Sequence, residues 1–286
     1  WASYFSYNST KLTTLNNCEN KGDVIDVPAE GCTIESCEIG GFIGEPYSNE
    51  SADENGVQPT IVFNNCNNSG NVVIGGKWTT THNPMVGGFI GVNNYDCIEM
   101  NTCENSGNVT VTTVETVAPR VGGFAGHDTN NGWWKLNNCT NSGEIKVDGV
   151  ATGITDGYTI KLGGFVGIKD SNVNLTFTNC KNLGKVTLGG EQTAKSTKAY
   201  NYCVGGFVGY TSSAKITFPG SVNGSETDAT KGAVSIVGKA PSGVALGGFI
   251  GLSTVAITLD GLKNYGPVQI SSACGESNTY RVNIGG

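Results

Sequence analysis

Gly163-Gly164-Phe165-Val166-Gly167 decides the fold, because this pentapeptide recurs along the whole chain. Every copy reads Gly-Gly-Phe, then a small or branched apolar residue, then Gly. Successive copies begin 47, 35, 41, 42, 42 and 38 residues apart, the last being the partial copy Gly285-Gly286. A period of this size is typical of solenoids, propellers and arrays, in which one repeat is one structural unit. The other complete copies begin at Gly40, Gly87, Gly122, Gly205 and Gly247.

A second motif, Asn-Cys-x-Asn-x-Gly-x-Val, lies between the pentapeptides and is complete in 17–24, 65–72 and 179–186. Two further copies carry single replacements, Thr102 for the first Asn and Ile145 for the Val. The Cys position lies 15 to 17 residues after the start of each pentapeptide, except for 26 residues after Gly40, where 45–58 is an acidic and polar insertion. In the last two copies, Ser221 and Leu262 occupy the Cys position.

One repeat contains three segments that resemble strands. Residues 174–178 alternate polar and apolar side chains, the pattern of a strand with one buried face. Residues 185–188 are a second short strand and 203–209, which include a pentapeptide, are a third. Between them, 181–184 (Lys-Asn-Leu-Gly) has turn chemistry, since Asn and Gly tolerate positive φ. No stretch has the apolar periodicity of a helix.

These features predict an all-β fold: a single-stack parallel β-helix, or β-solenoid, of about seven turns with three short strands each. Residues 1–286 would form one continuous domain. Equivalent strands of successive turns would pair in parallel, and stacking would bury a continuous core that no single turn can bury alone. A sandwich or barrel of hairpins is the alternative, but hairpins do not require repeats that match position by position.

Stacking gives each repeated residue a role. The Phe rings would stack on one another from turn to turn, and the two Gly before them would let neighbouring backbone approach closely. The Asn two residues after each Cys would form an amide ladder, and the Gly two residues further would supply a turn. The structural repeat positions are Phe42, Phe89, Phe124, Phe165, Phe207 and Phe249, with Cys18, Cys66, Cys103, Cys139 and Cys180.

The combination of Val-Gly-Gly-Phe-Val-Gly with Asn-Cys-x-Asn-x-Gly-x-Val resembles the GLUG-motif repeats of bacterial surface and secreted proteins. The resemblance covers essentially the whole chain, with Phe where the family commonly has Leu and Cys often where it has Ser or another small residue. It implies a right-handed β-helix on an exported protein, often the stalk or passenger of an adhesin-like polypeptide. It implies no catalytic residues, because the motif residues are structural.

The ten cysteines allow two interpretations. An even number in an exported protein suggests disulfides, and Cys32 with Cys37 and Cys97 with Cys103 are the pairs for local bridges. Ser221 and Leu262 in the Cys position favour instead a stack of buried thiols that act as small apolar residues. The remaining cysteines are Cys203 and Cys274. The sequence has no Cys-x-x-Cys, and His82 and His127 lie far from any Cys pair, so we identify no metal site and no cofactor.

Seven Asn-x-Ser/Thr sequons would be glycan acceptors in a eukaryotic secreted protein, although many arise by chance in a chain rich in Asn and Thr. Asn138 lies within the repeat motif, so six remain as glycosylation candidates. They are Asn8, Asn49, Asn67, Asn108, Asn174 and Asn223.

Charge and composition argue against nucleic-acid binding and a membrane span, and they give little support to catalysis. With 17 basic residues, a net charge of −7 and no basic run, nucleic-acid binding is not expected, and no apolar run is long enough to span a membrane. A carbohydrate-active enzyme would use carboxylates on one face, but the candidates are scattered over variable loops and are read as solvated side chains. They are Asp53, Glu54, Asp128 beside His127, Asp148 and Asp156.

Exposed aromatic residues are better candidates for binding, because they can stack on sugars or anchor a protein interface. Trp133, Trp134 and Tyr95 are possible contact residues, with Tyr200 and Tyr202 as a second pair, although packing of these loops against the flank of the solenoid is the favoured interpretation. Neither end of the sequence shows a polar cap, which predicts an internal segment of a longer chain or a subunit that stacks end to end.

The sequence therefore predicts an extracellular or cell-surface structural repeat protein, without enzymatic activity, that forms a stalk, fibre or surface-layer component. Its partners would be neighbouring solenoid units or copies of itself, with a glycan or a host or surface protein as a further candidate. The alternative is an adhesin passenger that binds carbohydrate or protein through its variable loops. A polysaccharide lyase or hydrolase is the least favoured hypothesis.

Overall fold

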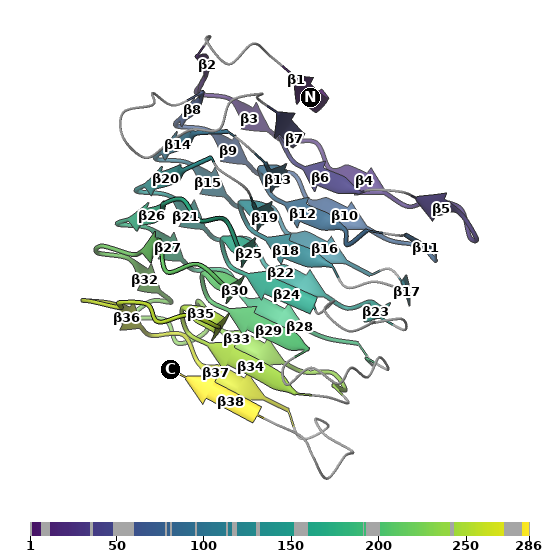
Figure 1. Cartoon of the computed structure of the whole chain (residues 1–286). Helices are drawn as coiled ribbons and strands as arrows, with labels where there is room; N and C mark the ends of the chain where they lie inside the picture. The colour runs from purple at the N-terminus through teal and green to yellow at the C-terminus, as the bar shows by residue number, and fades with distance from the viewer. Residues whose placement is uncertain are drawn as a thin grey trace.

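The described part of the chain in the computed structural model consists of β-strands and contains no helix. Its strands are stacked turn upon turn along one axis, with the two chain ends at opposite ends of the stack (Figure 1). Every strand pairing is parallel, which confirms the predicted β-solenoid. The structure describes residues 2–6, 12–34, 37–47, 60–77, 79–80, 82–94, 96–112, 114–115, 119–129, 132–151, 160–190, 192, 201–240, 243–271 and 282–285.

Five stacked sheets run the length of the solenoid, and we number them I to V in the order in which the chain passes through them. Sheet I contains β1 (Ala2–Ser6), β7 (Ile43–Tyr47), β13 (Ile90–Asn93), β19 (Ala125–Asp128), β25 (Val166–Lys169), β30 (Val208–Thr211) and β35 (Ile250–Ser253). Sheet II contains β2 (Thr13–Asn16), β8 (Ile61–Asn64), β14 (Ile98–Asn101), β20 (Trp134–Asn137), β26 (Leu175–Thr178) and β31 (Ile216–Thr217).

The next sheets are built from shorter strands. Sheet III contains β3 (Glu19–Asn20), β9 (Asn67–Asn68), β15 (Glu104–Asn105), β21 (Thr140–Asn141), β27 (Lys181–Asn182), β32 (Val222–Asn223) and β36 (Lys263–Asn264). Sheet IV contains β4 (Val24–Asp26), β10 (Val72–Ile74), β16 (Val109–Val111), β22 (Ile145–Val147), β28 (Val186–Leu188), β33 (Val234–Ile236) and β37 (Val268–Ile270).

Sheet V completes each turn. It contains β6 (Glu38–Gly40), β12 (Met85–Gly87), β18 (Arg120–Gly122), β24 (Ile160–Gly163), β29 (Tyr202–Gly205), β34 (Val244–Gly247) and β38 (Val282–Gly285). Two minor pairs lie beside the stack, β5 (Thr33–Ile34) with β11 (Thr79–Thr80) and β17 (Val114–Glu115) with β23 (Val150–Ala151).

Seven-stranded sheets confirm about seven turns, but the prediction of three strands per turn is wrong. The pentapeptide is not one strand: β24 ends at Gly163 and β25 begins at Val166, because the chain bends at the Gly-Phe pair. The predicted turn at 181–184 also contains a short strand, β27, which pairs with its equivalents above and below. A turn of the solenoid therefore contains five strands.

The tight turn before sheet III is made by the residue that precedes each Cys position. Asn17 has a φ of 53° and Thr102 a φ of 55°, both in the left-handed region that Asn and Gly occupy most readily. The Gly after the ladder Asn, which was expected to supply the turn, instead allows close packing: a Cβ on Gly107 would lie 2.0 Å from the carbonyl oxygen of Gly70 in the neighbouring turn. The other left-handed residues at this position are Asn65, Asn138, Asn179, Gly220 and Gly261.

The pentapeptide Phe rings form one continuous stack, as predicted. Phe89 and Phe124 lie with ring centroids 4.9 Å apart and ring planes parallel, and Phe124 and Phe165 lie 4.8 Å apart. Each ring is displaced by one turn from the next, so every Phe except the terminal ones is stacked between two others, and rings of sheet II and the turn after it add edge-to-face contacts, as between Phe63 and Phe89. The stack runs through Phe42, Phe89, Phe124, Phe165, Phe207 and Phe249.

The predicted amide ladder is also present, and we call it the inner ladder. Asn68 donates one Nδ2 hydrogen to Asn105 Oδ1 at 2.8 Å and the other to the Gly70 carbonyl at 3.0 Å, so both its donors are satisfied although the side chain is fully buried. The same bonds recur turn after turn. The inner ladder consists of Asn20, Asn68, Asn105, Asn141, Asn182, Asn223 and Asn264.

The inner ladder packs against the second Gly of each pentapeptide, which explains why the two motifs occur together. A Cβ on Gly88 would lie 2.2 Å from Asn105 Oδ1 and 2.2 Å from the Gly123 carbonyl oxygen, so only Gly fits. The apolar interior forms two separate columns. One lies between sheets IV and V and includes Val72 and Val86; the other lies among sheets I, II and III and includes the Phe stack.

The cysteines are free thiols at all nine described positions, so the structure favours the thiol stack and contains neither proposed local bridge; Cys274 lies outside the described residues. Cys103 Sγ donates to the Phe63 carbonyl at 3.5 Å, and Ser221 Oγ donates to the Phe177 carbonyl at 2.8 Å. From Cys66 to Ser221 the position therefore holds a small side chain that donates to the preceding turn, whereas Leu262 in the last copy cannot donate. Cys139 is held in its thiol form, because burial raises its pKa.

The first described turn is less buried than the middle of the stack. Leu15 and Val24 are half-buried, whereas their equivalents Phe63 and Val72 are 0% exposed. Asp26 occupies the place in sheet IV that Ile74 fills in the next turn. An inward charge of this kind discourages edge-to-edge pairing. Asp26 is one such residue in the first turn, and the prediction that neither end carries a polar cap stays a prediction.

Candidate functional site

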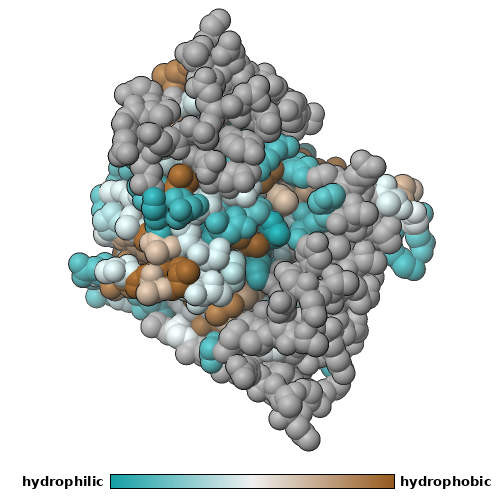
Figure 2. Space-filling view, viewed as in Figure 1, coloured by the Kyte–Doolittle hydropathy of each residue, from teal (hydrophilic) through white to brown (hydrophobic). Residues whose placement is uncertain are grey.

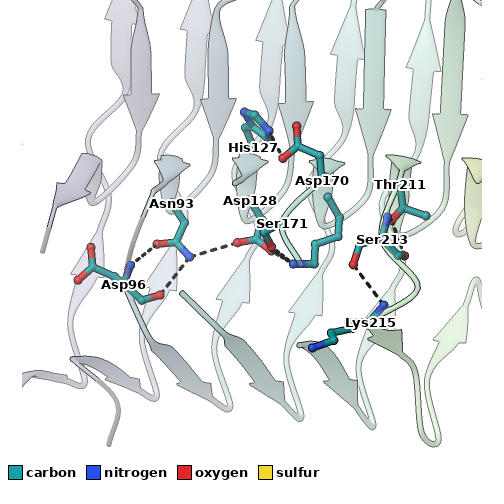
Figure 3. A network of polar contacts seen from close by, with 10 residues as sticks. Asn93, Asp96, His127, Asp128, Asp170, Ser171, Thr211, Ser213 and Lys215 are labelled. Atoms are coloured by element: carbon teal, nitrogen blue, oxygen red, sulfur yellow. Dashed lines mark hydrogen bonds and ion pairs between the residues drawn. The ribbon is translucent and has the colours of Figure 1, made fainter. Parts of the chain in front are cut away.

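The second residue after each of the last five complete pentapeptides contributes to a column of buried or half-buried polar side chains at the end of sheet I, which we call the polar column; after the first pentapeptide this position is Pro46. Asn93, Asp128 and Lys169 pair directly with one another in adjacent strands, and all three are 0% exposed. Their side chains and partners lie in a row across successive turns (Figure 3). The polar column consists of Asn93, Asp128, Lys169, Thr211 and Ser253.

Three members of the polar column hold the turn that follows them. Thr211 Oγ1 donates to the Ser213 carbonyl at 3.0 Å and accepts from the Ser213 N–H at 3.1 Å. Asn93 holds Asp96 in the same way, through its Oδ1 and Nδ2, and Ser253 holds Val255. These side chains replace backbone partners that the tight turn does not provide.

The other two members carry opposite charges. Lys169 Nζ lies 3.0 Å from Asp128 Oδ2, and both side chains are 0% exposed. Ser171 contacts both partners: its Oγ accepts from Lys169 Nζ and lies 3.4 Å from Asp128 Oδ2. Asn93 Nδ2 donates to Asp128 Oδ1 at 3.2 Å, so each carboxylate oxygen has a partner.

A second group of charges lies beside this pair. Arg120 approaches His127 Nδ1 at 2.6 Å, and His127 Nε2 lies 2.8 Å from Asp170 Oδ1. Because a guanidinium only donates, Nδ1 must accept and the ring is the neutral tautomer with its proton on Nε2. Burial lowers the pKa of His127. Partial burial alone would raise the pKa of Asp170, but the hydrogen bond from His127 and the charge of Arg120 hold it below its ordinary value.

The hydrogen bonds among Arg120, His127 and Asp170 are better suited to holding these side chains in place than to exchanging a proton with a substrate. Both nitrogens of His127 are engaged, and its ring is 5% exposed, so it offers no free nitrogen to a substrate. Asp170, with 37% of its side chain exposed, is the outermost member of the group. The cluster connects two adjacent turns, β19 and β25, by charge and hydrogen bonding.

Of the catalytic candidates from the sequence, the structure brings only His127 and Asp128 into this cluster. Asp148 is half-exposed and pairs with Lys146 at 2.7 Å, as a solvated carboxylate would. Asp53, Glu54 and Asp156 lie outside the described residues. Sequence analysis missed Arg120, Lys169 and Asp170. The polar residue that stands two positions after five of the six complete pentapeptides was the signal that would have found the polar column.

The tryptophans do not form an exposed contact surface, which corrects that hypothesis for them. Trp134 is 0% exposed and occupies the inward position that Ile98 fills in the preceding strand of sheet II. Trp133 is 6% exposed, packs with Cys97 and Val173, and has Lys135 Nζ 4.4 Å from its ring centroid. Tyr202 is likewise buried in the core, and Tyr95 and Tyr200 lie outside the described residues.

One of the six sequons is excluded as a glycan acceptor. Asn223 is 0% exposed, and its Nδ2 donates to Asn264 and to the Gly232 carbonyl as part of the inner ladder. Asn108 and Asn174 are exposed and Asn67 is half-buried. Asn8 and Asn49 lie outside the described residues.

Comparison with protein-family models, curated proteins and solved structures finds no match for this chain. The resemblance to GLUG-motif repeats therefore stays a prediction from the motifs. Within the described ranges, no helix is long and apolar enough to cross a membrane, and no three His, Cys, Asp or Glu side chains converge as metal ligands. On the face seen in Figure 2, hydrophobic residues are dispersed among hydrophilic ones.

Proposed function

We propose that this chain is an extracellular structural repeat protein, the rod of a surface stalk, fibre or surface-layer component. The observation that carries the proposal is that each repeated motif residue contacts the neighbouring turn. Phe stacks on Phe, Asn bonds to Asn, and the Cys position donates to a carbonyl of the preceding turn. Such residues give continuity along one axis, which is what a rod requires. At about 4.8 Å per turn, seven turns extend roughly 35 Å.

The end turns support a role for neighbouring solenoid units as partners. At the first turn, Leu15, Cys18 and Val24 are half-buried. At the last described turn of sheet IV, Val268 and Ile270 are half-buried, whereas Val234 and Ile236 are 0% exposed. A further turn placed on either end would bury these side chains, at about 25 cal/mol per Å² of apolar surface.

Asp26 makes the stacking of a second copy on the first turn less favourable. A second copy added in register would place Ile270 against Asp26, which would bury a carboxylate against an apolar side chain. We therefore expect copies of this chain to associate weakly through this end. Asp26→Val is expected to strengthen the association.

Sedimentation velocity and negative-stain microscopy over a range of protein concentrations test the assembly. We expect Asp26→Val to form longer rods than the parent chain, and Leu15→Glu to abolish association. Thr110→Glu, on a mid-stack outward position of sheet IV, is the matched control and should change nothing. If Asp26→Val and the parent both remain compact monomers with intact circular dichroism, the fibre form of the proposal fails. Labelling of native cells with a membrane-impermeant reagent tests the surface location separately.

A further inference from the structure

The pair Lys169–Asp128 differs from every other ion pair between described residues in its burial. Both side chains are 0% exposed, whereas the exposed fractions are 32% and 42% for Lys146–Asp148 and 69% and 76% for Lys77–Glu30. Removing two charges from water carries a large desolvation penalty that their mutual attraction does not always repay. The three N–H groups of the ammonium meet two acceptors among the described residues, Asp128 and Ser171.

We propose that Lys169 and Asp128 condense to an intramolecular amide that links adjacent turns covalently. A proton first passes from the Lys169 ammonium to Asp128 Oδ2, which converts two buried charges into a neutral amine and a neutral acid. The Nζ lone pair then attacks Asp128 Cγ, and the electrons of the Cγ–Oδ1 double bond move to Oδ1. As that double bond re-forms, the Cγ–Oδ2 bond breaks, and Oδ2 leaves as water with a second proton from Nζ.

Lys169 and Asp128 alone supply all the atoms and electrons that the condensation requires. An ammonium with three hydrogens and a carboxylate give one amide N–H and one water molecule, without any oxidant, cofactor or co-reactant. Neither Lys169 nor Asp128 carries a charge afterwards. The site is closed to bulk water, which slows the reverse hydrolysis.

Two neighbours are placed to assist. Asn93 Nδ2 donates to Asp128 Oδ1 at 3.2 Å, so it faces the oxygen on which negative charge develops during the attack. Ser171 Oγ contacts Lys169 Nζ and lies 3.4 Å from Asp128 Oδ2, so it can relay the proton from one to the other. Asn93 comes from β13 and Ser171 follows β25, so three successive turns assemble the site (Figure 3).

Strand pairing holds the reacting groups together. Asp128 and Lys169 are direct register partners in β19 and β25, and Nζ lies 3.0 Å from Oδ2 in the folded chain. Fixing two reacting groups at this range gives effective molarities of about 10⁵ M or more. The reaction therefore requires the folded solenoid and would follow folding.

Intact mass spectrometry of the full chain, purified natively and then denatured, tests the proposal. We expect a mass lower than the sequence mass by one water molecule, and a branched peptide that joins Lys169 to Asp128 after proteolysis. A full sequence mass with separate Lys169 and Asp128 peptides would overturn it. Peptide mapping is needed because Asp-Gly sequences such as 148–149 can also lose water by forming a succinimide. A loss of water mapped only to such a sequence counts against the proposal.

Two variants distinguish the cross-link from a structural ion pair. Lys169→Arg keeps the charge but cannot form the amide, so it should have its full sequence mass. Asp128→Asn should release ammonia instead of water and reach the same final mass as the cross-linked parent. The Lys146 and Asp148 peptides are the internal control, because that exposed pair should stay unlinked. If a variant does not fold, the branched peptide of the parent chain alone decides.

Discussion

The inner ladder and the polar column are both rows of buried polar side chains that follow the solenoid axis, yet one is uniform and the other changes at every turn. Asn occupies all seven positions of the inner ladder. The polar column contains an amide, a carboxylate, an ammonium and two hydroxyls. In both rows the buried polar groups have hydrogen-bond or ion-pair partners.

The difference follows from where the hydrogen bonds go. An inner-ladder Asn bonds to its equivalents in the adjacent turns, so a change in one turn leaves partners unsatisfied in two others. Thr211 and Ser253 mainly serve the turn of their own repeat, so each can be chosen independently. A row whose members bond to their own equivalents in both adjacent turns is therefore kept uniform, whereas the polar column can vary because Thr211 and Ser253 bond within their own turn and Asp128 and Lys169 are complementary to each other.

The largest expected effect is in the uniform row. Asn141→Leu removes the bonds to Asn105 and Asn182 and strands their buried amide groups. We expect a loss of about 4 kcal/mol in the free energy of unfolding, at 1–3 kcal/mol per stranded group, measured by denaturant titration. Asn264→Leu, half-buried and bonded to one ladder neighbour, is the control and should lose about 1 kcal/mol. Equal losses would mean that the bonds to both neighbouring turns do not set the cost of replacing an inner-ladder Asn.

An intermediate effect is expected beside the polar column, at His127. Its pKa is lower in the folded chain than the ordinary value of 6.5, so as pH falls through 6.5 the unfolded chain takes up a proton that the folded chain does not. Stability should therefore fall by about 1 kcal/mol between pH 7 and about pH 5.5. The depressed pKa of Asp170 acts in the same direction at lower pH.

His127→Val, which places there the side chain found at Val92 in the preceding turn, should remove that part of the pH dependence. Ile168→Val, in the same row but without a titrating group, should leave the slope unchanged. Denaturant titrations of the three proteins at matched pH values give the comparison. An unchanged slope in His127→Val would show that His127 is not the responsible group.

A further effect, similar in size but a gain in stability, concerns the left-handed position before sheet III, where Thr102 is the one residue other than Asn or Gly. Thr102 adopts a φ of 55° where four other turns use Asn and two use Gly, and a branched side chain is strained there. Thr102→Asn should stabilise the chain by about 1 kcal/mol, measured as a higher denaturant midpoint with unchanged slope. Thr110→Asn, in an ordinary extended strand, should give no such gain. A midpoint that does not rise would mean that the strain is relieved elsewhere.

The uniform rows were predictable from the sequence because aligning the repeats places equivalent residues one above another. Phe124 on Phe165 and Asn105 on Asn141 follow directly from that alignment. The bend inside the pentapeptide did not follow, since alternation alone does not reveal that Gly-Phe divides one apparent strand into two. The left-handed turn was assigned to the wrong residue, because both Asn179 and Gly184 are able to adopt it.

The candidate cluster was harder to foresee, because it depends on residues that differ between turns. Asp128 and Lys169 are 41 positions apart, and only the register of β19 with β25 brings them together. Trp134 was a possible contact residue in the sequence, because the sequence does not show that its strand directs it inward, where Ile98 lies one turn before. The repeat predicts which positions meet, and the particular side chains determine what happens there.

The inner ladder also has a direction. Each Asn gives a hydrogen to the amide oxygen of the following turn, from Asn20 through to Asn264, and none of the six bonds runs the other way. Aligned bonds of this kind polarise one another, so an added turn strengthens those already present. The row offers an acceptor at Asn20 and a donor at Asn264. Growth by stacking is consequently vectorial: an incoming turn extends the row only if it arrives in the same orientation.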